Sequence, residues 1–127
     1  MKNSKTILSV LLLVVISAAF IFSQTTVKPK ITFIELGSVN CIPCKQMQPV
    51  MKAIEKKYGI QVKVVFYDVW KPEQKQFAEK YGVQLIPTQV FLDADGKEFF
   101  RHEGFYPEKE IDKLLQSKGM KSNNSKG

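Results

Sequence analysis

The chain has 127 residues, of which 44% are hydrophobic and 24% are charged. This length and composition suit one globular domain and leave no room for a second. The formal net charge is +7, but the basic residues form no clustered motif, so nucleic acid is not an expected partner.

The chain begins with the pattern of an export signal. Lys2 and Lys5 precede an almost unbroken apolar run over residues 7–22. A charged start followed by an apolar stretch is typical of secretory signal peptides. We therefore expect an exported protein that works in the periplasm or another extracytoplasmic space.

Residues 1–22 have two interpretations. Ser17, Ala18 and Ala19 are small residues of the kind that a signal peptidase needs, which favours a cleaved signal peptide. The apolar run continues past them, however, and its 16 residues are only slightly short of the roughly 20 that span a membrane as a helix. The alternative is an anchor in the cytoplasmic membrane, followed by a linker over residues 23–29.

The first half of the domain alternates strand, helix and strand. Residues 31–36 are mostly apolar, with β-branched and aromatic side chains, which predicts a central strand. Apolar residues at steps of three and four predict an amphipathic helix over residues 45–58, with a kink at Pro49. Residues 62–67 predict a second strand, covered on both faces and parallel to the first.

The second half adds a helix, a hairpin and a last helix. A proline in front and a glycine beyond the end favour a helix over residues 72–81. The Asp95-Gly96 step predicts a hairpin between strands at 89–92 and 98–102. A final amphipathic helix is expected over residues 107–117.

These elements give the order β-α-β-α-β-β-α for an α/β domain over residues 30–117. Residues 118–127 consist of Gly, Ser, Asn and Lys with one Met. Such a composition predicts a flexible basic tail.

Cys41 and Cys44 are the only cysteines, and their spacing places two thiols one helical turn apart. A pair this isolated is either a redox centre or half a metal site. A structural zinc site needs four ligands, and His102 is the only histidine. Haem attachment needs a histidine directly after Cys44, where Lys45 stands. We expect a redox-active disulfide and no metal or other cofactor, with a copper(I) carrier as an alternative.

A Cys-X-X-Cys motif that opens a helix directly after a strand resembles the thioredoxin family. Cys41-Ile-Pro-Cys44-Lys45 is similar to its active-site motif, and Ile86-Pro87-Thr88 stands where the family has its cis-proline. Glu35, six residues before Cys41, stands at the place of a buried acid, and Gly104 fits the glycine after the last strand. The resemblance implies a minimal thioredoxin fold, with a four-stranded mixed sheet flanked by three helices.

Three residues depart from the thioredoxin pattern. Asn40 replaces a tryptophan, Ile42 a glycine and Glu35 an aspartate, and the extra N-terminal strand and helix of full thioredoxins have no space here. The closest resemblance is to small exported or membrane-tethered thioredoxin-like proteins. It implies protein disulfides as substrates and a membrane thiol electron carrier of the cytochrome c biogenesis type as a partner. We expect a monomer.

The two cysteines have different expected roles. A cysteine at the start of a helix has its thiolate stabilised by unpaired N–H groups and the helix dipole, so Cys41 is the predicted nucleophile. Cys44, one turn later, is the predicted resolving thiol. Pro43 offers no N–H to the Cys41 thiolate, which favours a reductase over an oxidant. Ile42 presents apolar surface beside the reacting sulfur.

Further side chains are candidates for the site. The Glu35 carboxyl is expected beneath the cysteine pair, where burial raises its pKa and lets it accept the Cys44 proton; the alternative is an acid turned to water. The resemblance implies a cis bond before Pro87, with the backbone of Ile86 pairing with an extended substrate. Asn40 is expected to cap the helix. We expect Trp70 to pack at the end of its strand rather than line the substrate groove.

The sequence therefore predicts a thiol-disulfide oxidoreductase, most simply a disulfide reductase that works through the Cys41/Cys44 dithiol and a mixed disulfide. A non-catalytic binding module with the same fold is the alternative from another class.

Overall fold

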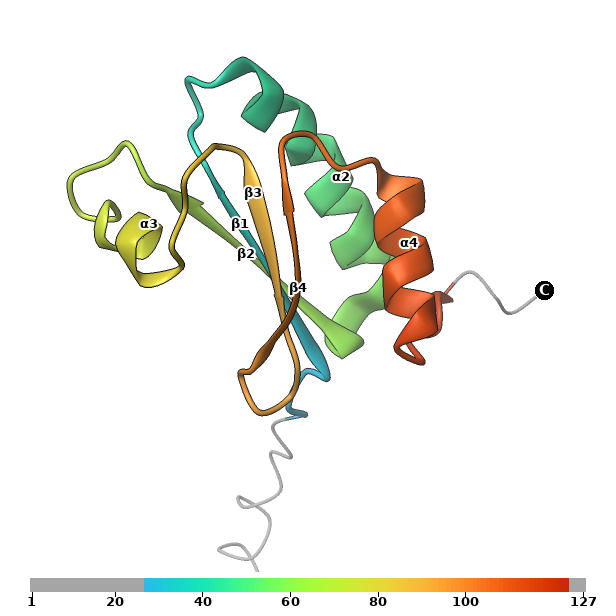
Figure 1. Ribbon diagram of the computed structural model, residues 1–127. Coiled ribbons are helices and arrows are strands. Elements are labelled where there is room, and N and C mark those ends of the chain that lie inside the picture. The colour runs from blue at the N-terminus through green and yellow to red at the C-terminus, as the bar shows by residue number, and fades with distance from the viewer. Residues whose placement is uncertain (1–26, 124–127) are drawn as a thin grey trace, which may run out of the picture.

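The computed structural model describes residues 27–123, and they form a four-stranded mixed sheet with helices on both sides (Figure 1). The predicted order of strands and helices is confirmed. The elements are β1 (Ile31–Gly37), α2 (Ile42–Tyr58), the short 3₁₀-helix η2 (Gly59–Gln61), β2 (Val62–Asp68), α3 (Gln76–Lys80), β3 (Thr88–Leu92), β4 (Glu98–Glu103) and α4 (Glu108–Ser117).

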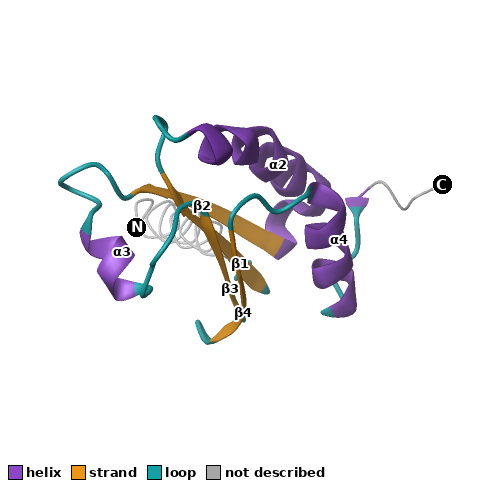
Figure 2. Ribbon diagram, turned by 45° about the horizontal axis from the view of Figure 1, so that its top comes forward, coloured by secondary structure: helices purple, strands orange, loops and turns teal. Residues whose placement is uncertain are grey.

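The strands lie in the order β2-β1-β3-β4, so β1 is a central strand as predicted. It runs parallel to β2 and antiparallel to β3. Figure 2 shows α2 and α4 together on one face of the sheet and α3 on the other. Alternation along β1 sends Phe33 and Glu35 to the α2/α4 face, and Ile34 and Leu36 to the α3 face.

Strand β2 lies at the edge of the sheet, and both of its faces are nevertheless covered. Val64 and Phe66 pack against the core under α2 and α4, whereas Val65 and Tyr67 pack on the α3 side. This explains its nearly continuous apolar sequence. Lys63 points to solvent, as is common on an edge strand.

Helix α2 begins three residues earlier than its apolar pattern predicts. The Cys41 sulfur accepts a hydrogen bond from the Cys44 backbone N–H at 3.3 Å, and this bond caps the first turn. The predicted end is confirmed by Gly59, whose positive φ of 53° is a conformation that favours glycine. The helix continues through Pro49 as one element.

The predicted helix over residues 72–81 is wrong in its first half, because α3 covers only Gln76–Lys80 and turns precede it. The side-chain oxygen of Gln74 accepts a hydrogen bond from the Asp68 backbone N–H at 2.7 Å. This bond ties the segment to the end of β2. Phe77 still covers the sheet, with its ring stacked on Tyr67.

The β3–β4 hairpin is confirmed. Gly96 has a φ of 82°, as the predicted turn requires. The Asp93 carboxylate accepts hydrogen bonds from the backbone N–H groups of Asp95 and Lys97, and so closes the loop.

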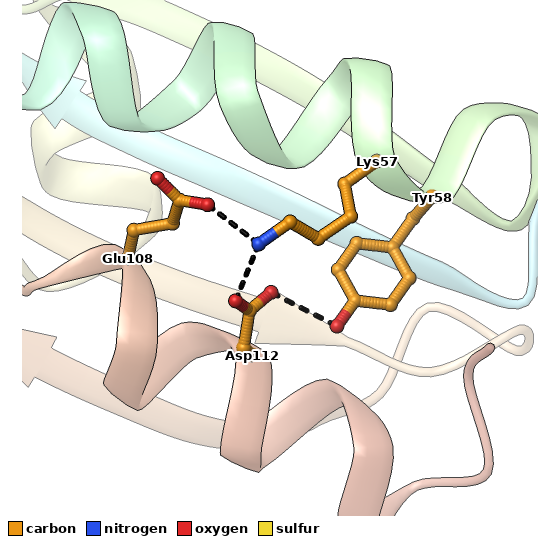
Figure 3. Close-up of polar contacts among 4 residues, drawn as sticks. All are labelled: Lys57, Tyr58, Glu108 and Asp112. Atoms are coloured by element: carbon orange, nitrogen blue, oxygen red, sulfur yellow. Dashed lines mark hydrogen bonds and ion pairs between the residues drawn. The ribbon is translucent and has the colours of Figure 1, made fainter. Parts of the chain in front are cut away.

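A polar cluster joins the C-terminal end of α2 to the first half of α4 (Figure 3). The Lys57 ammonium pairs with Glu108 and Asp112, and the Tyr58 hydroxyl donates to Asp112 at 3.0 Å. The hydrogen bonds to Asp112 and Glu108 raise the pKa of Lys57 to about 12. The cluster holds α4 against the helix that carries the cysteines.

The packed domain extends beyond residue 117, where the sequence predicted its end. Met120 is only 7% exposed and belongs to the core. Gln61 exchanges two hydrogen bonds with the Lys121 backbone. Residues 118–121 are therefore part of the packed structure rather than of a flexible tail.

The expected export segment and most of the expected linker lie in residues 1–26, outside the described residues, as do residues 124–127. In residues 27–123, no helix is long and apolar enough to cross a membrane.

Candidate active site

Cys41 and Cys44 form a disulfide at the start of α2, with Cα atoms 5.2 Å apart. Cys41 is the N-cap residue, and its backbone is extended, whereas Cys44 lies inside the first turn. Cys44 is completely buried, and Cys41 retains 7% of its surface exposed. Only the first cysteine is thus open to a partner from outside.

A buried carboxylate holds the loop in front of Cys41. Asp68 accepts hydrogen bonds from the backbone N–H groups of Val39 at 3.3 Å and Trp70 at 3.2 Å. The Val69 N–H donates to the Gly37 carbonyl at 2.9 Å. The loops that follow β1 and β2 are thereby fixed to each other. Asp68 was not among the residues predicted for the site, although a carboxylate at the end of an apolar strand is a signal that the sequence contains.

The helix is capped by Cys41 itself, so the expectation that Asn40 caps it is wrong. The Asn40 side chain is exposed, and its backbone N–H donates to the Ser38 hydroxyl at 3.2 Å. Neighbouring Ile42 and Pro43 are exposed as well, beside the sulfur of Cys41.

Glu35 is fully buried, which contradicts the alternative of an acid turned to water. By alternation it shares the α2 face of the sheet with Gly37. A methyl group at Gly37 would lie 3.1 Å from the Cys44 sulfur, so the first turn of α2 sits directly on the end of β1. Glu35 occupies the next position along this strand on the same face.

Burial raises the pKa of Glu35 from an ordinary 4.5 to about 8. A hydrogen bond from Gln89 Nε2 to Glu35 Oε1, 3.3 Å long, acts in the opposite direction and lowers it. Glu35 Oε2 has no hydrogen-bond partner among the described residues. The result is a carboxyl group that changes charge near neutral pH in the interior of the domain.

The Ile86–Pro87 bond is cis, as the resemblance implied. Thr88 pairs with Leu36 of β1, so Pro87 lies at the same end of the sheet as Gly37 and the cysteine pair. The Pro87 carbonyl accepts a hydrogen bond from the Gly104 N–H at 2.7 Å. Gly104 has a φ of 88° and follows β4, the position at which the resemblance implied a glycine.

Exposed apolar side chains gather in the loops at this end of the sheet. Trp70 is 59% exposed and does not pack at the end of its strand, contrary to expectation. The other large exposed members follow β1, begin α2, precede β3 and follow β4. We call this set the apolar rim, and it consists of Val39, Ile42, Trp70, Leu85 and Phe105. Exposed apolar surface gathered around a reactive group is typical of a protein-binding site.

Three comparisons place this fold and site among known proteins. The thioredoxin-like domain family matches residues 17–119. Thioredoxin of Bacillus subtilis is 36% identical over 75 residues, which cover 59% of this chain and 69% of that protein. Thioredoxin of Malassezia sympodialis is 38% identical over 78 residues, covering 61% and 73%. The crystal structure of a thioredoxin from Nicotiana alata superposes with a TM-score of 0.61 at 34% identity, covering 69% of this chain and 72% of that one.

Proposed function

This chain belongs to the thioredoxin-like domain family and is a thiol-disulfide oxidoreductase, and we propose that it works as a disulfide reductase outside the cytoplasm. The observation that carries the proposal is the disulfide at the first turn of α2, with Cys41 at the surface and Cys44 beneath it. This arrangement suits a nucleophile backed by a resolving thiol.

The reaction passes two electrons from the dithiol to the substrate. The Cys41 thiolate attacks one sulfur of a substrate disulfide, which forms a mixed disulfide and releases the other substrate sulfur as a thiolate. Cys44 then loses its proton and attacks the Cys41 sulfur. The Cys41–Cys44 disulfide forms, and the second substrate thiolate leaves.

The direction of electron flow rests on the first turn of α2. Pro43 is the second residue of the helix and has no N–H, so the Cys41 sulfur loses one donor that could stabilise its thiolate. The Cys44 N–H is the donor that remains in contact with it. A less stabilised thiolate makes the reduced form a stronger reductant, as in the less oxidising members of this fold.

Glu35 is proposed as the acceptor of the Cys44 proton. Its pKa of about 8 suits proton transfer at neutral pH, and its place on β1 puts it on the strand that contacts Cys44. Glu35→Gln should slow single-turnover reduction of a disulfide at pH 7 by at least about 100-fold. The variant should also lose the limb of the pH–rate profile near pH 8.

Stopped-flow measurement of the reduced protein against a chromogenic disulfide tests this role. Glu103→Gln, which changes an exposed carboxyl at the end of β4, is the matched control and should behave as wild type. An unchanged rate and profile in Glu35→Gln would rule out the proton relay.

The apolar rim is the proposed docking surface for protein substrates. Trp70 is its largest member, and Trp70→Ser should raise KM for a protein disulfide about 3- to 10-fold, since a buried aromatic anchor contributes about 1 kcal/mol or more. Reduction of a small disulfide should keep its rate. Ile60→Ser is the control, because Ile60 is 71% exposed at the opposite end of the sheet. Equal KM changes for both variants would disprove the docking role.

We further propose that the protein is exported and that its Cys41–Cys44 disulfide is reduced again after each reaction by a donor at the membrane. The charged and apolar pattern of residues 1–22 supports a signal peptide or a membrane anchor. Because extracytoplasmic spaces are oxidising, a reductase there needs electrons from across the membrane. A membrane thiol carrier of the cytochrome c biogenesis type is the proposed donor. Cell fractionation of the full chain and of a variant without residues 1–22 tests the location. The full chain should be found outside the cytoplasm and the variant inside it. A full chain found in the cytoplasm, like the variant, would contradict the proposed location.

A further inference from the structure

Gln89 is a polar side chain at the centre of the sheet, and it is hydrogen-bonded to Glu35. It lies on β3 opposite Glu35 and is fully buried. Its Nε2 donates to Glu35 Oε1 at 3.3 Å and to the Gly104 carbonyl at 3.1 Å. These two bonds use both hydrogens of the amide nitrogen.

The Gly104 carbonyl decides which end of the Gln89 amide faces Glu35. A carbonyl can only accept, so the amide must turn its NH2 group toward Gly104. Gly104 is itself tied to the loop before β3, because its N–H donates to the Pro87 carbonyl. Gln89 therefore presents a donor to Glu35, and a donor stabilises the carboxylate rather than the protonated acid.

Packing alone does not explain an amide at this position. Gln89 Oε1 is buried without a partner among the described residues. A buried unpaired acceptor is destabilising, and an apolar side chain of the same size would avoid that cost. The benefit of the amide must lie in the two bonds that its NH2 group makes, to Glu35 and to the Gly104 carbonyl.

We propose that Gln89 is a positioning residue that holds the Glu35 carboxyl in place and favours its charged form, which rests on the proton-accepting role proposed for Glu35. A chain of hydrogen bonds then runs from Glu35 through Gln89 and Gly104 to Pro87. It links the proposed base to the loop before β3, which is expected to pair with the substrate. The same contacts that shape the loop also orient the base.

Other titratable groups share this face of the sheet. They are Asp68 at the end of β2, His102 on β4 beside Gln89, Tyr106 stacked on His102, and the cysteine pair on α2. In the oxidised protein the two cysteines form a disulfide and do not titrate. A comparison of variants over the same pH range then cancels the contributions of the other three.

The experiment measures the titration of Glu35 directly. Gln89→Met keeps the length of the side chain and removes the donor. In oxidised protein with 13C-labelled glutamate, the Glu35 carboxyl should titrate at higher pH in Gln89→Met than in wild type, with its acid dissociation constant lowered roughly tenfold. Gln89→Leu provides a second variant if the first does not fold. Gln61→Met, a glutamine at the far end of the sheet, should leave the titration unchanged.

A Glu35 titration that stays in place in the folded Gln89 variants would overturn the inference, even if those variants are less stable. The titration does not depend on catalysis, so it separates the two proposals. If the Glu35 titration moves while the pH–rate limb does not, the Gln89 inference stands and the relay through Glu35 falls. If both move together, both proposals are supported.

Discussion

Cys41→Ser is expected to abolish disulfide reduction, with a loss of at least about 10³-fold in the rate with a protein substrate. The serine hydroxyl is not ionised at neutral pH and cannot attack a disulfide. Buried Cys44 cannot take over, because its surface is completely covered by the first turn of α2 and by β1. An insulin-type reduction assay measures the effect.

Cys44→Ser is the matched control for the division of roles. Cys41 can still attack in this variant, but nothing resolves the product, so a stable mixed disulfide with the substrate should accumulate. Non-reducing electrophoresis and mass spectrometry detect it. Full turnover by Cys41→Ser, or trapping by Cys41→Ser rather than by Cys44→Ser, would reverse the assignment.

Glu35→Gln is expected to make the oxidised protein more stable at alkaline pH. The pKa of Glu35 is about 8 in the folded protein and close to 4.5 in the unfolded chain. Between these values the folded state binds more protons than the unfolded state, so stability falls as pH rises from about 4.5 to about 8. The shift corresponds to about 5 kcal/mol lost by wild type across that window. A neutral amide avoids this loss.

Guanidinium unfolding of the oxidised protein at pH 5 and pH 9 measures the difference. The two proteins should be similar at pH 5, and Glu35→Gln should be more stable by several kcal/mol at pH 9. Glu55→Gln, at an exposed position of α2, should follow wild type at both pH values. A stability difference that does not change with pH would show that Glu35 does not titrate in this window.

Local patterns in the sequence were enough to predict the order of the elements. Alternation and apolar runs identified β1 and β2, and the Asp95-Gly96 turn identified the hairpin, because these signals act over a few residues. The first half of the predicted helix over residues 72–81 forms turns instead, and here the Gln74 side chain bonds to the Asp68 backbone six residues earlier. No local pattern reports such a contact.

The site could be predicted in part for the same reason. The resemblance to a known family identified the site residues that stand at the positions of that family's motifs. These residues are Cys41, Cys44, Glu35 and Pro87. Gln89 escaped notice because its role comes from lying opposite Glu35 in the sheet, 54 residues away in sequence. Trp70 was wrongly expected to be packed, because its exposure depends on the path of the loop after β2, which the sequence does not indicate.

The reduction potential of the Cys41/Cys44 pair most directly tests whether the protein is a reductase. Equilibration with glutathione or a reference thioredoxin, followed by alkylation of free thiols, measures it. We predict a value near that of thioredoxin, about −270 mV, because Pro43 withholds a donor from the Cys41 thiolate. A value near about −120 mV, typical of a strong oxidant that donates disulfides, would contradict the proposed direction of electron flow.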